Sequence, residues 1–225
     1  MIPEEVKEME EWERLKYLAY EKEALGFYIT GHPLQQYKKR LRGLITHSIS
    51  QLHGNLNSHT EIRLAGIIAS VKPLKTRKGD RMATFVLEDM DSRIEIVAFP
   101  ESYGKYYESI QKELLVWVKA SVQSNGGSIR VQLIQIMPLE DAFQKMAKKL
   151  ILRVNLPALE RSVFDDIKAL LMEFEGECQV LLELETKDAL KVLLQSVDIQ
   201  GANCAREMIE RLEDLLGDNA VIIQY

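Results

Sequence analysis

A change in the spacing of apolar residues does most to limit the folds open to this chain. Residues 4–25 carry apolar side chains at helical spacing, whereas from about residue 60 to residue 137 apolar and polar residues alternate with a period of two. Such alternation predicts β-strands with one buried face. The elements expected there, in chain order, are the strands Ile62–Lys72, Met82–Glu88 and Arg93–Phe99, a helix at Tyr103–Lys112, and the strands Leu114–Gln123 and Ser128–Met137.

Three strands, a helix and two more strands follow the element order of an OB-fold, a five-stranded Greek-key barrel. Asn125-Gly126-Gly127 has the composition of a tight turn between the last two strands. Side-chain parity on the second and third strands separates an inward, barrel-filling set from an outward set. The inward set is Ala83, Phe85, Leu87, Ile94, Ile96 and Ala98, and the outward set is Met82, Thr84, Val86, Arg93, Glu95, Val97 and Phe99.

Helical segments are expected before the barrel. The helix over residues 4–25 should end at Gly26, because glycine is a common helix terminator. A second helix should run from Pro33 to Arg42-Gly43. The polar stretch His53–Ser58 then predicts a linker.

The part of the chain after the barrel alternates strands and helices behind a charged connector, Pro138–Lys148. The elements expected are the strand Leu150–Asn155, the helix Pro157–Phe174, the strands Cys178–Glu185 and Leu190–Leu194, the helix Ala202–Leu216 and the strand Ala220–Tyr225. This βαββαβ order predicts a sheet covered by two helices. The chain is therefore expected to be α+β, with a helical segment and linker at residues 1–59, an OB-fold nucleic-acid-binding domain at residues 60–138 and a protein-interaction domain at residues 148–225.

Charge is distributed unevenly along the chain. The net charge is −5, but residues 60–137 carry eleven basic and nine acidic side chains, and residues 138–225 carry ten basic and seventeen acidic ones. An acidic total argues against tight, non-specific binding of nucleic acid by the whole chain. It allows a local contact through the middle segment, and it suits the last segment to a protein partner.

The expected loop between the first two strands is the strongest candidate for that local contact. OB-folds bind nucleic acid with this loop, with the loop between strands four and five, and with the face of strands two and three. The alternative is an ordinary solvated hairpin loop. The five basic residues of the loop are Lys72, Lys75, Arg77, Lys78 and Arg81.

Three further residues complete the candidate nucleic-acid interface: Arg93, Phe99 and Lys119. Phe99 is the only aromatic residue among the outward positions of strands two and three, and Glu95 there would repel phosphate. Bases stack on aromatic side chains when single strands bind. The sequence therefore predicts weak affinity, on the order of 10⁻⁴ to 10⁻⁶ M.

A second basic cluster, Lys38, Lys39, Arg40 and Arg42, falls in the last turns of the helix expected from Pro33. Cations at a helix C-terminus are stabilised by the helix dipole. That interpretation is preferred, and a phosphate contact is the alternative.

Catalytic, metal and cofactor signatures are not found in the sequence. It contains no phosphate-cradling glycine loop, and the four histidines lack metal-ligand spacing, with His32 expected to make a structural hydrogen bond. Asp89-Met90-Asp91 could share a divalent ion, but the position favours a turn between strands. Cys178 and Cys204 are interpreted as packed, reduced thiols. No catalytic residue, metal or cofactor is assigned.

The cytoplasm is the expected location, because the sequence shows neither a membrane-spanning segment nor a leader peptide. No apolar run approaches the ~18 residues that span a bilayer. Met1 is followed by an acidic segment and not by a basic, apolar leader.

Several segments resemble one family in the same order. Residues 21–34, Glu-Lys-Glu-Ala-Leu-Gly-Phe-Tyr-Ile-Thr-Gly-His-Pro-Leu, resemble the segment before the OB domain in the alpha subunit of bacterial DNA polymerase III. The OB domain itself is similar at Leu64–Ile68, Thr76–Gly79, Leu87–Asp89 and Val97–Pro100. Residues 150–225 are similar in length and pattern to the C-terminal domain of that subunit.

The resemblance implies a division of labour. The catalytic palm, the fingers, the histidinol-phosphatase-like domain and the clamp-binding peptide match nothing here, so the chain looks like the C-terminal part of such a subunit. The resemblance implies that the barrel holds single-stranded template DNA, through Lys72, Lys75, Arg77, Lys78 and Arg81. It also implies two protein partners, the tau subunit of the clamp loader at the last domain and the rest of the alpha subunit.

Two other readings stay open. The chain could be a free-standing nucleic-acid adaptor, because the same barrel occurs as an anticodon-binding module in class II aminoacyl-tRNA synthetases. Alternatively, the barrel could be a spacer and the last domain the working part.

Overall fold

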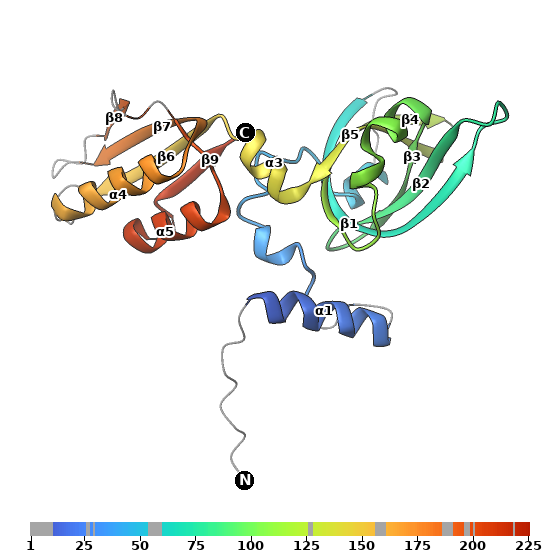
Figure 1. Ribbon diagram of the computed structural model, residues 1–225, viewed down its shortest axis with the longest axis horizontal. Helices are drawn as coiled ribbons and strands as arrows, with labels where there is room; N and C mark the ends of the chain where they lie inside the picture. Colours follow the sequence, from blue (N-terminus) through green and yellow to red (C-terminus); the bar gives the residue numbers. More distant parts are fainter. Residues whose placement is uncertain are drawn as a thin grey trace, which may run out of the picture.

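A closed five-stranded barrel forms the middle of the chain (Figure 1). The computed structural model describes residues 11–25, 28, 30–53, 60–125, 128–155, 161–185, 191–195, 199, 201–217 and 219–225. The strands pair in the order β1-β2-β3-β5-β4, and β1 closes the barrel on β4, which confirms the OB-fold. The strands are β1 (Thr60–Lys75), β2 (Arg81–Glu88), β3 (Arg93–Ala98), β4 (Leu115–Asn125) and β5 (Ser128–Pro138).

The long strand β1 serves two sides of the barrel. Its first half, Thr60–Ile67, pairs with β4, and its second half, Ile67–Lys75, pairs with β2. An irregularity between Ile68 and Ser70 allows the strand to bend between the two partners. Gly66 lies where β1 packs tightly against β2, because a Cβ there would stand 2.6 Å from Cγ of Leu87.

The barrel core follows the parity expected from the sequence. Five of the six inward residues of β2 and β3 are buried, and Ile94 is partly buried against the same core. Apolar side chains from β1, β4 and β5 complete this cluster. Burial of each large aliphatic or aromatic side chain contributes about 1.5–3 kcal/mol.

The helix between β3 and β4 begins earlier than expected. It is α2 (Pro100–Tyr106), followed by the 3₁₀ turn η3 (Tyr107–Ser109), whereas the expected range was Tyr103–Lys112. Pro100 stands at the first helical position, where a missing N–H costs no hydrogen bond.

In the described part of the segment before the barrel there are one α-helix, α1 (Glu11–Leu25), and two 3₁₀ turns, η1 (Gln35–Tyr37) and η2 (Ser50–His53). The second α-helix expected from Pro33 to Arg42 is wrong, because only η1 and tight turns occupy that stretch. The apolar residues with helix-like spacing are nevertheless buried in one cluster: Leu34, Tyr37, Leu41 and Leu44. Their spacing therefore reflects tertiary packing and not a regular helix.

The C-terminal unit is a four-stranded sheet in the order β8-β7-β6-β9. β6 and β7 are parallel, and the other pairs are antiparallel. Both helices pack on one face of the sheet, as the βαββαβ pattern predicted (Figure 1). The elements are β6 (Lys149–Asn155), α4 (Arg161–Glu173), β7 (Glu175–Glu185), β8 (Lys191–Gln195), α5 (Arg206–Leu216) and β9 (Val221–Gln224).

A third apolar cluster joins the two units. The connector after the barrel contains α3 (Leu139–Lys145), whose Phe143 is fully buried against Tyr37 and beside Tyr225. Trp117 on β4 belongs to the same cluster and donates from Nε1 to the carbonyl of Leu44 at 3.2 Å. We call this cluster the junction.

Some expected elements lie outside the described residues. These are residues 4–10 of the first helix with its Gly26 terminator, Gly54–Ser58 of the linker, the two glycines of the Asn125-Gly126-Gly127 turn, residues 157–160 of the helix expected from Pro157, and Leu190 of the strand Leu190–Leu194. Within the described part of the chain, no helix is long and apolar enough to cross a membrane.

Candidate nucleic-acid interface

The hairpin between β1 and β2 ends in an ordered turn. The backbone N–H of Thr76 donates to the carbonyl of Asp80 at 2.9 Å, and the Thr76 hydroxyl accepts from the N–H groups of Lys78 and Asp80. Gly79 has φ +91°, a conformation that residues with a side chain rarely adopt. These hydrogen bonds fix the backbone of the turn that carries Arg77 and Lys78.

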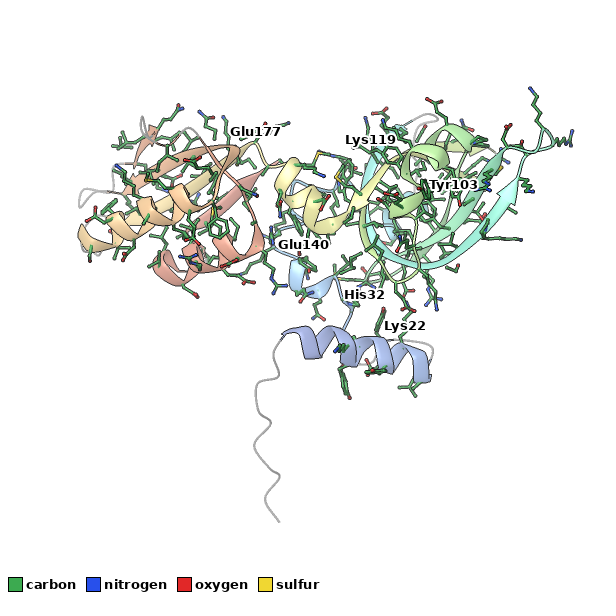
Figure 2. All side chains as sticks on the ribbon, viewed as in Figure 1. Lys22, His32, Tyr103, Lys119, Glu140 and Glu177 are labelled. Atoms are coloured by element: carbon green, nitrogen blue, oxygen red, sulfur yellow. The ribbon has the colours of Figure 1, made fainter. Side chains whose placement is uncertain are left out.

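This hairpin extends away from the barrel, with its tip clear of the rest of the molecule (Figures 1 and 2). All five basic residues expected to contact DNA there are exposed. Within the described part of the chain, no ion pair involves any of them, and Asp80 is the one acidic residue of the tip. Cations that are free of protein partners are available to phosphates. The five residues are Lys72, Lys75, Arg77, Lys78 and Arg81.

A groove of about 670 Å³ lies over the outer face of β2 and β3, beside the start of β5. It collects six of the seven outward positions expected from parity, together with residues of β5. The lining residues are Met82, Thr84, Arg93, Ile94, Glu95, Val97, Phe99, Ile129, Arg130 and Val131.

Strand register connects the hairpin to the groove. Lys72 is paired with Thr84, which is paired in turn with Val97, and residues that face one another across antiparallel strands share a face. Lys72 therefore lies on the groove side of the sheet. Lys75 and Arg81 pair with one another, and Lys75 is three residues from Lys72 along β1. Because side chains alternate between the faces of a strand, Lys75 and Arg81 lie on the face opposite Lys72.

Arg93 enters the groove with its charge partly neutralised. Its Nε lies 3.0 Å from Oε2 of Glu88, which Lys22 also contacts at 3.1 Å. Burial alone raises the pKa of Glu88, but the bonds from Lys22 and Arg93 outweigh burial and lower it. Glu88 is therefore ionised at neutral pH, and Arg93 is less available to phosphate than the hairpin cations, which form no ion pair among the described residues.

Phe99 and Lys119 lie in different places. Phe99 lines the groove with 37% of its surface exposed. Lys119 is on β4, does not line the groove, and forms an ion pair with Glu61 at 2.8 Å (Figure 2). The structure thus brings Arg93 and Phe99 to one surface and leaves Lys119 on another.

Arg130 is a groove residue that the sequence did not single out. It is exposed, and no described residue forms an ion pair with it. Its outward direction follows from the neighbouring buried Val131. Arg130 reaches the groove because β5 pairs in parallel with β3, where Ile96 faces Val131. A local sequence pattern does not reveal this pairing, since the two strands are far apart in the sequence.

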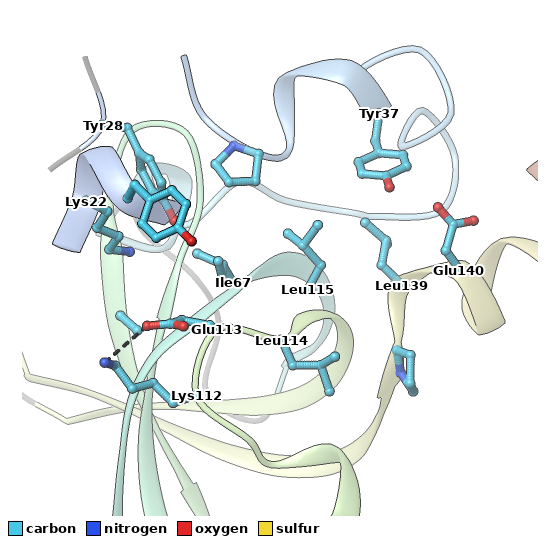
Figure 3. Close-up of a pocket in the computed structure, with 14 residues that line it drawn as sticks. Lys22, Tyr28, Tyr37, Ile67, Lys112, Glu113, Leu114, Leu115, Leu139 and Glu140 are labelled. Atoms are coloured by element: carbon cyan, nitrogen blue, oxygen red, sulfur yellow. Dashed lines mark ion pairs between the residues drawn. The ribbon is translucent and has the colours of Figure 1, made fainter. Parts of the chain in front are cut away.

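A larger cavity, about 770 Å³, lies between the segment before the barrel and strands β1 and β4 (Figure 3). Its floor is apolar, with Ile67 and Leu115, and Tyr37 and Glu140 face one another at one end. Burial, with a smaller effect from Glu88, raises the pKa of Tyr28 to about 12, so this phenol is protonated at neutral pH. The described lining residues form no acid–base pair suited to catalysis.

Asp89 has the turn function that its position predicted. One carboxylate oxygen accepts from the N–H groups of Asp91 and Ser92 at 3.0 and 2.9 Å, and the other accepts from the N–H of Ile49 at 2.7 Å. The carboxylate is therefore fully used by the backbone. No group of acidic, histidine or cysteine side chains suited to a metal ion occurs among the described residues.

His32 is also structural. Its Nδ1 accepts from the backbone N–H of Leu34 at 3.1 Å, and its ring packs edge-on against Tyr28. Burial lowers the pKa of this imidazole, so it is neutral at physiological pH.

A closed five-stranded barrel with this strand order defines the class of OB-fold domains. Residues 62–139 match a family model that is labelled tRNA anti-codon and described as "OB-fold nucleic acid binding domain".

The whole chain is similar to part of a larger protein, the alpha subunit of DNA polymerase III. It is 30% identical to that subunit from Pseudomonas fluorescens over 226 residues, which cover 100% of this chain and 19% of the relative. The Bacillus subtilis subunit is 26% identical over 217 residues, covering 96% of this chain and 19% of the relative. The chain thus spans about a fifth of the length of these relatives, and the resemblance seen in its motifs is confirmed.

Among solved structures, the chain is similar to Rim1, a mitochondrial single-stranded DNA binding protein from S. cerevisiae. The match has 17% identity and a TM-score of 0.32, and it covers 36% of this chain and 96% of the other.

Proposed function

We propose that this chain is the C-terminal part of a bacterial replicative DNA polymerase III alpha subunit, and that its barrel holds single-stranded template DNA. The observation that carries the proposal is the exposed cationic hairpin beside the groove on β2 and β3. Similarity to polymerase alpha subunits over the whole chain supports it.

Phosphate contacts dominate the proposed binding. Lys72 and Arg130 stand on the groove side of the sheet, and Arg77 and Lys78 extend the positive surface to the tip. Among the described lining residues Phe99 is the only aromatic one, so stacking adds little. Glu95 in the same groove opposes phosphate. We therefore expect weak and salt-sensitive binding, on the order of 10⁻⁴ to 10⁻⁶ M at physiological salt.

Fluorescence anisotropy with a labelled oligothymidine, at 50 and 200 mM salt, tests the proposal. The double change Arg77→Ala and Lys78→Ala should weaken binding by about tenfold and reduce the salt dependence, because two phosphate contacts are lost. Arg130→Ala should weaken binding by about two- to fivefold.

The matched control replaces two exposed lysines outside the hairpin and groove, Lys105→Ala and Lys112→Ala. This double variant has the same change in net charge and should bind nearly as well as the parent chain. If both double variants lose the same affinity, the hairpin is not the contact.

Catalysis of nucleotide incorporation is proposed to belong to the other regions of the alpha subunit, which are the further protein partner of this chain. A primer-extension assay with this chain alone should therefore give no product. Incorporation of a labelled nucleotide by the purified chain would refute this division of labour.

The C-terminal unit is proposed to bind the tau subunit of the clamp loader. The support is the resemblance, together with the acidic composition of residues 138–225, which disfavours nucleic acid there. Surface plasmon resonance of purified tau over the immobilised chain tests this contact. Absence of binding by the intact chain would remove tau from the proposal without affecting the DNA contact.

A free-standing RNA adaptor is the second candidate, favoured by the family label, which refers to the tRNA anticodon. Competition between oligothymidine and oligouridine of equal length separates the two. A preference for RNA of tenfold or more would favour the adaptor.

A further inference from the structure

A basic cleft of about 420 Å³ lies away from the barrel groove, between the residues after η1 and the β9 end of the C-terminal sheet. It gathers side chains from four separate parts of the chain. Four lining residues are basic, namely Lys39, Arg40, Arg42 and Arg153, and one is acidic, Glu213. Three of these residues, Lys39, Arg40 and Arg42, belong to the second basic cluster, which the sequence placed at the C-terminal end of an expected helix.

The cleft follows the edge of a β-sheet. β9 is the outermost strand, and among the described strands it pairs only with β6. Val221, Ile222 and Ile223 all line the cleft. Because consecutive strand residues point to opposite faces, a cleft that touches three in a row runs along the strand edge. Such an edge presents unpaired N–H and C=O groups that can accept another strand.

The cations around this edge differ in how far they are already engaged. Arg40 is held by the carbonyl of Cys204 at 3.2 Å and by the ring of Phe143, so it forms a fixed wall. Arg153 pairs with Glu183 at 3.1 Å. Arg42 is exposed and has no ion-pair partner among the described residues. Residues 138–225 are acidic overall, so a basic cleft against this domain is a local exception.

We propose that this cleft binds an acidic, extended peptide segment of a partner protein, added as a strand beside β9. Strand addition supplies main-chain hydrogen bonds, and alternating side chains of the peptide supply specificity. Its carboxylates would lie against Arg42 and Arg153, and its apolar side chains against Val221 and Ile223.

The edge favours a peptide over a nucleic acid. A β-strand edge needs a partner that alternately donates and accepts hydrogen bonds, as a peptide backbone does. A DNA backbone has phosphate and sugar oxygens that only accept. The cleft is also separate from the groove on β2 and β3, so peptide binding does not depend on the proposed DNA contact.

A fluorescein-labelled heptapeptide of alternating glutamate and valine is a suitable probe, with a heptapeptide of alternating glutamine and valine as its uncharged control. Anisotropy with the full chain should show binding of the acidic peptide that weakens between 50 and 200 mM salt. Arg42→Glu should weaken it by about tenfold and Arg153→Gln by about threefold. Lys38→Glu, an exposed residue of the same segment outside the cleft, should change it by less than about twofold.

Hydrogen exchange gives a second readout that does not depend on a variant. Amide exchange in residues 219–225 should slow when the acidic peptide is bound, because new main-chain hydrogen bonds form there. No slowing at saturating peptide would overturn strand addition.

Other results would also overturn the proposal. These are equal binding of the uncharged peptide, binding insensitive to Arg42→Glu, displacement of the peptide by oligothymidine, and a dimer of this chain that Arg42→Glu abolishes. The first two deny charge recognition, the third identifies a nucleic-acid site, and the fourth identifies a second copy as the occupant. Circular dichroism of each variant establishes that a lost signal does not reflect unfolding.

Discussion

At the scale of single residues, the availability of a charge matters more than its presence. Arg93 lines the groove but already binds Glu88, and Lys119 binds Glu61 on another side of the barrel. Arg130 and the hairpin cations have no such partners in the described part of the chain. Sequence reasoning could identify all of these residues as basic, but ion pairs between strands decide which of them can meet a phosphate.

Glu88 provides a prediction at this scale. Its pKa in the folded protein is lowered, so the stability that its ionised form contributes is present above the pKa of an unfolded glutamate, near 4.5. That contribution is lost as the pH falls through the lower, folded value. Glu88→Gln should therefore reduce the free energy of unfolding by about 1 kcal/mol at pH 7 and by less at pH 3.5.

Urea unfolding of both proteins across this pH range measures the effect. A difference between them that is the same at pH 7 and pH 3.5 would contradict the role given to the Lys22–Glu88–Arg93 network.

At the scale of elements, the sequence predicted the strands well and the segment before them poorly. Alternation located all five barrel strands to within a few residues, because one buried face imposes a period of two. The stretch after Pro33 has helix-like apolar spacing, but its apolar residues are buried by α3 and β4, which a local pattern does not contain. The groove was incomplete for a related reason, since Arg130 reaches it through a pairing between distant strands.

Gly66 provides a prediction at the element scale. A methyl group there would stand 2.6 Å from Cγ of Leu87 and 2.7 Å from the carbonyl oxygen of Glu88. Gly66→Ala should force β1 and β2 apart and destabilise the chain by about 1–3 kcal/mol, measured by urea unfolding.

Gly104→Ala is the control, because nothing lies within 4 Å of the added methyl group and alanine favours a helix. It should leave stability unchanged or raise it. Equal stability of the two variants would show that β1 and β2 tolerate separation at Gly66.

At the scale of the whole molecule, the described residues form three buried apolar clusters. One fills the barrel, one lies between the C-terminal sheet and its helices, and the junction connects them through α3. The sequence indicated a charged connector at this point, but it did not indicate that residues around Tyr37, Trp117 and Tyr225 would meet on it.

Phe143 tests the junction. It is fully buried and contacts Tyr37, Tyr225 and the guanidinium of Arg40. Phe143→Ala should cost about 3–5 kcal/mol in the free energy of urea unfolding. It should also increase the radius of gyration measured by small-angle X-ray scattering, because the two units lose their common support. A cost below about 1 kcal/mol with an unchanged radius would mean that the units are held together elsewhere.

The arm formed by β1 and β2 has a consequence for any polyanion laid against it. Lys72 faces one side of this two-stranded arm, whereas Lys75 and Arg81 face the other. Positive charge is therefore present on both faces of the arm. A polyanion that contacts either face of the arm would therefore meet positive charge there.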